Sequence, residues 1–319
     1  MKHSYSIVGL LCMIFFFAQV FGLFSASYSF NLVEINQSSD SLKQDEAQEF
    51  FGRTIKENIY FITAITAGII IASIIVLILN RFNKQRIWRI WYGFAVLFCV
   101  YITLSIFFNR SIALSFALIA MMIKLSKRHL YLLKIIIEIL IYTGIAIIFS
   151  FNLTPFWAFI LLLIISIYDY LAVFRLKHMI TIAEFQKKTG AFSGIMIGYK
   201  DKKEMTKDYT KEDSGIKKDE EIKKGKRYKN EREIREKTAI LGGGDIVFPL
   251  IYNISFFQWA SLLFLSESLA FLATSIIALI QTLSIFLLLI LGKQNKYYPA
   301  MPFLTASTFL GSILILALI

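Results

Sequence analysis

Long apolar runs separated by short polar groups dominate the chain. A helix that crosses a bilayer needs about 20 mostly apolar residues, and most of these runs approach that length. The fourth run is short for a full crossing. The pattern predicts an all-α polytopic membrane protein with nine transmembrane helices. The predicted spans are Ser6–Phe24, Asn58–Leu79, Trp88–Phe108, Ser111–Ile123, Leu130–Phe149, Pro155–Phe174, Ala239–Asn253, Leu269–Leu291 and Pro302–Ile319.

A strongly charged segment separates the sixth predicted span from the seventh. Residues 175–237 contain 19 Lys or Arg and 12 Asp or Glu, with few large apolar residues after Tyr199. Such a composition buries too little apolar surface to fold by itself. An apolar stretch at 191–199 is the exception, and we expect it on the membrane surface or near a substrate. The predicted organisation is a six-helix membrane block over residues 1–178, a charged flexible cytoplasmic linker over 179–237 and a three-helix membrane block over 238–319.

Lys and Arg residues next to the spans predict their orientation, because short cytoplasmic loops are enriched in these residues. They follow the second, fourth and eighth spans, whereas residues 28–57 are net acidic. The amino terminus and the 175–237 linker are therefore predicted to be cytoplasmic, and the carboxyl terminus to be outside. The four N-x-S/T sequons fall on the predicted outer side, at Asn36, Asn109, Asn152 and Asn253.

The first span has a second interpretation, as a signal peptide. Lys2 precedes it, and Ser25-Ala26-Ser27 resembles a small-x-small cleavage site. The apolar stretch is longer than the core of a usual signal peptide, which favours a retained helix. Cleavage would leave the orientation of the later spans unchanged.

Composition and charge narrow the classes of function. Hydrophobic residues make up 57% of the 319 residues, above the ~45–50% of soluble domains, so a water-soluble enzyme is not expected. The net charge of +12 comes from Lys and Arg beside the spans and in the linker, which indicates a lipid bilayer, and not nucleic acid, as the partner. Cys12 and Cys99 are isolated and no H-E-x-x-H occurs, so no metal site or cofactor is predicted.

Ionisable side chains inside the predicted spans are rare, and each costs at least ~2.5–3.5 kcal/mol to place there. They are Lys134, Glu138, Asp169 and Asp245. Lys134 and Glu138 are four residues apart on the fifth span, a spacing that predicts a structural pair. Gln281, in the middle of the eighth span, is expected to make an interhelical hydrogen bond. The two aspartates are therefore the candidates for chemistry.

Asp169 and Asp245 lie at similar depths in adjacent predicted spans. Asp169 comes six residues before Arg175, and Asp245 comes eight residues after Lys237. These offsets are about 9 and 12 Å along a helix from the cytoplasmic interface. Two neighbouring carboxyls in a low-dielectric site cannot both ionise, so they share one proton and form an acid and a base. Such a pair can activate water against an amide carbonyl and protonate the leaving nitrogen, which is aspartyl peptide hydrolysis.

Three short motifs include or follow these aspartates. They are Tyr168-Asp169 in the sixth span, Gly242-Gly243-Gly244-Asp245 in the seventh, and Pro299-Ala300-Met301-Pro302 at the ninth. In this order and spacing they resemble the motifs of the presenilin and signal peptide peptidase family of G-x-G-D intramembrane aspartyl proteases. Two positions depart from the family pattern: Met301 stands where Leu is usual, and Gly243 stands where a larger apolar residue is usual.

The resemblance covers essentially the whole chain and implies a presenilin-like fold with Asp169 and Asp245 as catalytic residues. It also implies transmembrane helical proteins or peptides as substrates, no cofactor and no metal, and it leaves accessory subunits or a homo-oligomer open. The charge distribution favours the presenilin orientation over the inverted one of signal peptide peptidases. The residues implied to shape the substrate site are Tyr168, Gly242, Gly243, Gly244, Pro299, Ala300, Met301 and Pro302.

Other classes of protein fit parts of the sequence. An ion- or proton-coupled transporter would use the same two aspartates, but the chain shows no second copy of either aspartate motif, as repeated transporter halves would. A prepilin-type peptidase shares G-x-G-D but lacks the proline motif, and a catalytically silent scaffold is a further alternative. The predicted function is intramembrane aspartyl cleavage of single-span substrates, with the transporter as the alternative.

Overall fold

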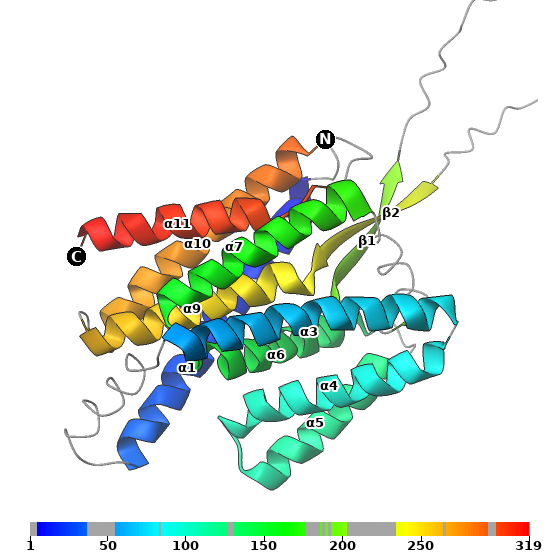
Figure 1. Ribbon diagram of the computed structural model, residues 1–319. Helices are drawn as coiled ribbons and strands as arrows, with labels where there is room; N and C mark the ends of the chain where they lie inside the picture. Colours follow the sequence, from blue (N-terminus) through cyan, green and yellow to red (C-terminus); the bar gives the residue numbers. More distant parts are fainter. Residues whose placement is uncertain are drawn as a thin grey trace, which may run out of the picture. The chain divides into compact units, whose positions relative to one another are not determined.

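Nine α-helices and a pair of β-strands form the regular structure of the described residues in this computed structural model (Figure 1). The structure describes residues 5–36, 55–82, 84–126, 130–176, 186, 189–190, 193–202, 234–263, 266–292 and 298–318. The helices are α1 Tyr5–Asn36, α3 Ile55–Arg81, α4 Gln85–Ser105, α5 Arg110–Leu125, α6 Tyr131–Ser150, α7 Pro155–Leu171, α9 Gly243–Leu263, α10 Glu267–Leu291 and α11 Met301–Leu318. The strands are β1 Gly194–Lys202 and β2 Ile234–Gly242.

Seven of the described helices are long and apolar enough to cross a membrane: α1, α3, α4, α6, α7, α10 and α11. The expectation of nine transmembrane helices is therefore confirmed only in part. α5 has 16 residues, so it extends about 24 Å, less than the ~30 Å hydrocarbon core of a bilayer. α9 contains Asp245, Asn253 and Gln258, whose polar side chains lower its mean hydropathy. The apolar helices make the chain an integral multi-pass membrane protein.

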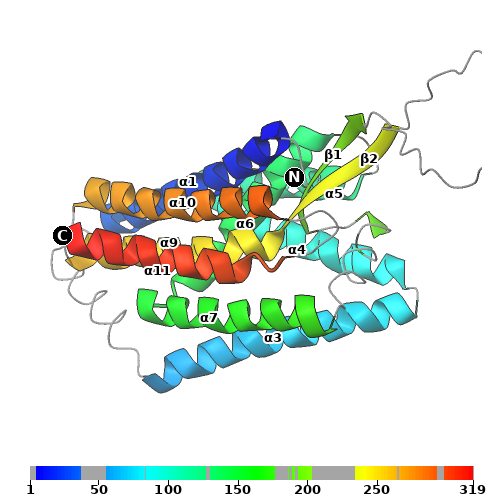
Figure 2. The same ribbon diagram turned by 90° about the horizontal axis from the view of Figure 1, so that it is seen from above.

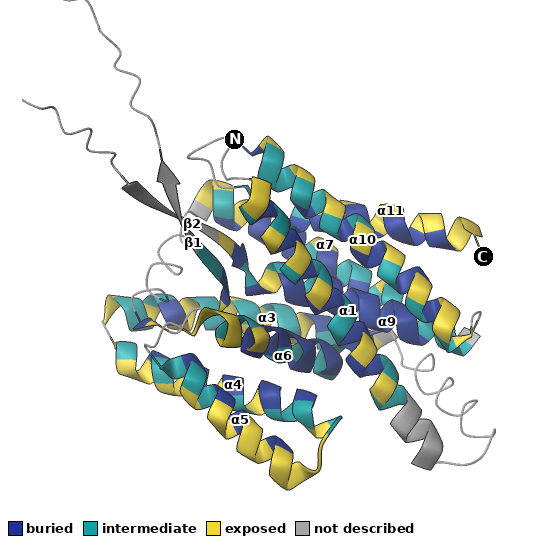
Figure 3. Cartoon of the chain, turned by 180° about the vertical axis from the view of Figure 1, so that it is seen from behind, coloured by how far each residue is buried: buried dark blue, intermediate teal, exposed yellow. Residues whose placement is uncertain are grey.

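The outward faces of the helices are apolar, as contact with lipid requires. On α3, for example, Ile70, Ile71, Ile74 and Ile78 are 44–55% exposed. Figure 3 shows exposed positions along the outer face of α5. An apolar surface of this extent is rare on soluble monomers, where a large exposed patch marks a contact with another phase or partner. The lipid tails of a bilayer supply that contact here.

α9 is the most completely surrounded of the described helices and is buried along its length (Figure 3). It packs against α1, α6, α7, α10 and α11. Ile246, Leu250, Ile254, Phe257 and Ala260 all have 0% exposure. Nearly every position from 246 to 260 is buried, so α9 is enclosed by its neighbours instead of presenting one face to them. The position of α9 therefore determines where Asp245, in its first turn, meets the other helices (Figure 2).

A hydrogen-bonded network of buried amides joins α9 to three other helices. Asn253 of α9 donates to Gln19 of α1 (3.0 Å) and to Gln281 of α10 (2.9 Å). Gln281 in turn donates to the hydroxyl of Thr308 on α11 (2.8 Å). A buried amide without a hydrogen-bond partner costs free energy. These bonds therefore favour the one helix register in which all of the amides are paired. The interhelical hydrogen bond expected of Gln281 is confirmed.

The seventh predicted span is displaced relative to the helix. The prediction was Ala239–Asn253, whereas residues 239–242 belong to β2 and α9 runs over Gly243–Leu263. The difference has a local cause, because glycine is a poor helix former and the residues before the glycine run pair with β1 instead. Asn253 is consequently buried in the middle of α9, and the predicted position of its sequon on the outer side is wrong.

The predicted pair of Lys134 and Glu138 is also wrong. Glu138 forms a buried ion pair with Lys124, at the end of α5. The Nζ atom of Lys134 instead donates to the carbonyl oxygen of Ser126 (2.7 Å). Because α5 packs against α6, a lysine from another helix reaches Glu138. Spacing within a single span cannot reveal such a partner.

Residues Met196–Ile240 form a compact unit distinct from the helical one. Its described part consists of paired strands, which the prediction of a flexible linker did not include. Ile195, Ile197 and Tyr199 recur at every second position of β1, the period of a strand, and are residue types enriched in strands. Most of the predicted linker, residues 203–233, lies outside the described residues, and its flexibility stays a prediction.

We expect Gly144→Ala to destabilise the packing of α6 on α4. A Cβ atom added at Gly144 would lie 2.3 Å from the carbonyl oxygen of Cys99 and 2.9 Å from the hydroxyl of Thr103. Overpacking of this kind costs about 1–3 kcal/mol, which thermal unfolding in detergent would record as a lower Tm. The matched control is Gly68→Ala, where no atom lies within 4 Å of the added Cβ. Equal Tm values for the two variants would contradict the predicted clash.

Candidate active site

Asp169 lies on the buried face of α7, two residues before the helix ends. Leu162, Ile165, Ser166 and Asp169 are all buried and recur every three or four residues, so they share one face of the helix. That helix packs against α9 and α11 (Figures 1 and 2). A π-helical turn, Ala172–Leu176, follows directly. The carboxyl of Asp169 is therefore only 5% exposed although it lies near a helix end.

The start of α11 supplies hydrogen-bond donors to Asp169. The backbone N–H of Met301 donates to Oδ2 of Asp169 (3.2 Å), and the backbone N–H of Ala300 also bonds this carboxyl. The first N–H groups of a helix have no partner within it, and a helix N-terminus favours negative charge. Pro302 lies in the same turn and has no N–H that needs a partner, while Pro299 is buried just before it. The proline motif therefore begins α11 and presents free donors to Asp169.

Asp245 lies in the first turn of α9, directly after the glycine run, and is partly buried. The backbone N–H of Gly242 bonds its carboxyl. A Cβ atom at Gly242 would lie 3.0 Å from Oδ2 of Asp245, so a larger residue there would crowd the carboxyl. Gly243 lies against the ring of Tyr142 on α6. Two of the glycines therefore allow close approach, one by the aspartate and one by another helix.

The two carboxyls interact electrostatically across the contact between α7 and α9. Asp169 accepts two backbone N–H groups and Asp245 accepts one. Two carboxyls that repel each other among apolar helices favour sharing one proton, because the second negative charge would lack solvation and be repelled by the first. The arrangement can therefore supply an acid and a base at the same point.

The remaining predicted site residues have weaker connections to the carboxyls. The hydroxyl of Tyr168 lies 3.2 Å from Oγ of Ser73 on α3, so its phenol reaches toward a neighbouring helix. Gly244 is exposed, and the atoms nearest to a Cβ added there belong to Phe248 of the same helix. The structure thus brings the proline motif to Asp169 and Gly242 to Asp245, while Tyr168 and Gly244 contact other groups.

Tyr142 is a neighbour of the site that the sequence did not identify. Its ring packs on Gly243, and its hydroxyl interacts electrostatically with Asp245. Tyrosine is frequent in this chain, with 15 residues, so no local pattern distinguishes this one. Only the packing of α6 on α9 reveals it.

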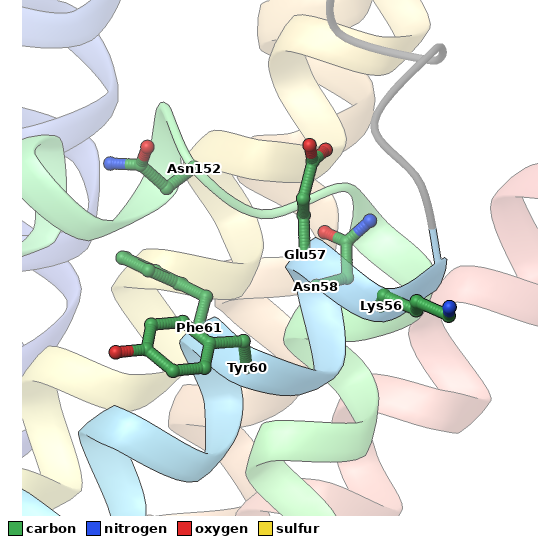
Figure 4. A pocket seen from close by; sticks show the side chains of 6 residues that line it. All are labelled: Lys56, Glu57, Asn58, Tyr60, Phe61 and Asn152. Atoms are coloured by element: carbon green, nitrogen blue, oxygen red, sulfur yellow. The ribbon is translucent and has the colours of Figure 1, made fainter.

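A separate cavity of about 500 Å³ lies near the turn that precedes α7, at the other end of that helix from Asp169 (Figure 4). This cavity is therefore distinct from the carboxyl pair. Within the described ranges, no three His, Cys, Asp or Glu side chains gather as a metal site would require. The cavity is lined by Lys56, Glu57, Asn58, Tyr60, Phe61 and Asn152.

Comparison with known proteins assigns the chain to a family. A family model described as signal-peptide peptidase, presenilin aspartyl protease, matches residues 38–319. Among solved structures, the chain is similar to a presenilin family intramembrane aspartate protease, with a TM-score of 0.55 and 20% sequence identity over 97% of this chain and 99% of that one. At this identity the likeness establishes the fold. No curated protein matches the chain. The family model covers most of the sequence, and the chain belongs to the signal-peptide peptidase and presenilin family of aspartyl proteases.

Proposed function

We propose that the chain is an intramembrane endopeptidase that cleaves single-span transmembrane substrates with Asp169 and Asp245 as its catalytic pair. The observation that carries the proposal is the electrostatic contact between these two carboxyls, from α7 and α9, in a chain of an aspartyl protease family. Both carboxyls lie among helices whose outer faces are apolar. A substrate that reaches them must come through or along the bilayer, which favours a transmembrane segment.

The donors around the two carboxyls favour a particular division of roles. Asp169 accepts the N–H groups of Met301 and Ala300 at the start of α11, and such donors stabilise its ionised form. Asp169 is then the base, and Asp245 keeps the shared proton. Asp169 takes a proton from water as the water oxygen attacks the scissile carbonyl carbon, and Asp245 donates its proton to the carbonyl oxygen.

Breakdown of the resulting tetrahedral diol restores the starting protonation state of both carboxyls. Asp169 passes its proton to the amide nitrogen, the C–N bond breaks, and Asp245 takes back a proton from a diol hydroxyl as the new carboxyl group forms. Water supplies every atom that is added, so the cycle needs no cofactor. The substrate helix must unwind locally first, because a helical peptide bond is shielded by its own hydrogen bonds.

The orientation of the chain in the membrane is part of the proposal. Lys and Arg residues follow the second, fourth and eighth predicted spans, which supports a cytoplasmic amino terminus and 175–237 linker and a carboxyl terminus outside. Asp169 and Asp245 then lie near the cytoplasmic ends of their helices. We expect substrates whose amino termini are outside. Accessory subunits and self-association are left open.

Replacement of either aspartate by asparagine is expected to abolish cleavage. Asp169→Asn and Asp245→Asn keep the side-chain volume but remove the proton transfer, which contributes about 10²–10⁴ in rate. The assay is cleavage of a single-span peptide by purified protein in lipid vesicles, with products identified by mass. Glu57→Gln, a carboxyl-to-amide change in the distant cavity, is the matched control and should cleave normally. If either aspartate variant keeps most of the wild-type rate, the aspartyl mechanism is wrong.

Removal of the donor at Met301 should slow cleavage more than removal of its side chain. Met301→Pro deletes the N–H that bonds Asp169 at a helix position where proline is tolerated. A hydrogen bond to a charged group contributes about 1.5–3 kcal/mol, so kcat should fall about 10- to 100-fold. Met301→Ala removes the side chain and keeps the N–H. Comparable rates for the two variants would show that the hydrogen bond does not support catalysis.

A single cysteine at Ser214, in a background with Cys12 and Cys99 replaced, tests the orientation. The positive charges around this position predict a cytoplasmic location. An impermeant thiol reagent should therefore leave intact cells unlabelled and label the protein after the membrane is permeabilised. Ready labelling of intact cells would show that the topology is the reverse of the predicted one, and the expected substrate polarity would then be reversed as well.

A further inference from the structure

A buried ion pair lies one helix away from the proposed catalytic carboxyls. Lys124 of α5 and Glu138 of α6 are 7% and 2% exposed and bond each other. The hydroxyl of Tyr92, from α4, also donates to Oε1 of Glu138 (3.3 Å). Buried ion pairs seldom add net stability, because desolvation of both charges offsets their attraction. The fold alone therefore gives little reason for this pair.

The pair is connected to the glycine run through Tyr142. Glu138 and Tyr142 are four residues apart on α6 and so share one face of the helix. The buried hydroxyl of Tyr142 has no hydrogen-bond partner among the described residues and lies within electrostatic range of both Glu138 and Asp245. The ring is 1% exposed. Tyr142 thus lies between a fixed charge pair and the start of α9.

The ring of Tyr142 occupies the space that a side chain at position 243 would need. A Cβ atom added to Gly243 would lie 3.0 Å from Cε1 and 3.2 Å from the hydroxyl oxygen of Tyr142. Asp245 follows two residues later in the same first turn. This contact gives a physical reason for glycine at a position where the family usually has a larger apolar residue, since the aromatic ring of another helix supplies the missing volume.

We infer that Tyr142 is a positioning residue for Asp245, held in place by the Glu138–Lys124 ion pair and packed on Gly243. The inference rests on the proposed function. The ring packs on Gly243 and so sets where the first turn of α9 begins. Tyr142 reacts with nothing itself. It limits the range of positions that the Asp245 carboxyl can take relative to Asp169.

The first test removes only the hydroxyl. Tyr142→Phe should lower kcat about tenfold, the effect of a single lost polar contact to a charged group, and leave KM unchanged, because the residue does not touch substrate. Tyr252→Phe is the matched control. Like Tyr142, Tyr252 is buried, but it lies on α9 about two turns after Asp245. Its hydroxyl and that of Ser312 are 2.7 Å apart. Tyr252→Phe should lower Tm and leave kcat unchanged.

The second test asks whether the ion pair acts through Tyr142. Glu138→Gln combined with Lys124→Met removes both charges and nearly preserves volume, so neither charge is left buried alone. This double variant should lower kcat by about the same factor as Tyr142→Phe, and the triple variant should be no slower than the double one. If the fold-loss of kcat in the triple variant equals the product of the losses in the double variant and in Tyr142→Phe, the ion pair and Tyr142 act separately. That result would overturn the inference.

The third test enlarges the side chain at position 243 and removes the facing ring at position 142. Gly243→Leu should reduce kcat sharply, because its side chain meets the ring of Tyr142, and Gly243→Leu with Tyr142→Ala should restore kcat to about the level of Tyr142→Phe. A purely structural role predicts a recovery in Tm without a matching recovery in kcat. Wild-type protein and Asp245→Asn are assayed beside these variants. If wild-type protein cleaves nothing, the proposed function fails; if it cleaves and Tyr142→Phe keeps the wild-type kcat, only the positioning role fails.

Discussion

The hydrogen bond from the first turn of α11 to Asp169 is the interaction on which the site depends. A carboxylate buried among membrane helices has little water to solvate it, so protein donors must stabilise its charge. The N–H of Met301 is free because it opens a helix, and it reaches Asp169 directly. One turn further, the hydroxyl of Thr305 donates to the carbonyl oxygen of Met301 in its own helix (2.9 Å) and lies 3.4 Å from the carbonyl oxygen of Leu162 on α7. α7 and α11 pack against each other here, and the N–H of Met301 holds the Asp169 carboxyl toward the start of α11.

Asp245 is held by a different set of contacts, which meet at the start of α9. Pro249 has no N–H, so it cannot donate to the carbonyl of Asp245 one turn earlier. Gln19 of α1 donates to the next carbonyl, that of Ile246 (3.0 Å), and Asn253 holds the same glutamine from the other side. The first turn of α9 is thus supported by Gln19 of α1, next to the carbonyl that lacks a donor within the helix. This support lets a glycine-rich helix start carry a buried carboxyl.

The sequence predicted the parts of this structure that depend on local pattern. Apolar run lengths located the helices, and the positions of Asp169 and Asp245 relative to nearby charges placed them at matching ends of adjacent helices. It failed where a tertiary partner decides the outcome. Lys124, and not Lys134, pairs with Glu138 because α5 folds against α6. The start of α9 and the strand before it depend on pairing with β1, and the role we assign to Tyr142 depends on which helix faces Gly243. None of these partners is encoded in the spacing of residues along one element.

The location of both carboxyls at helix ends suits the intramembrane hydrolysis that we propose. An unwound substrate exposes N–H and C=O groups that the hydrocarbon core cannot satisfy. Helix ends are where a membrane protein has unpaired backbone groups of its own, and Asp169 lies two residues from the end of α7 while Asp245 lies in the first turn of α9. A site in the middle of these helices would offer no such partners and would lie farther from water. In the proposed function, an extended peptide would pair with backbone groups at these helix ends that the carboxyls do not use.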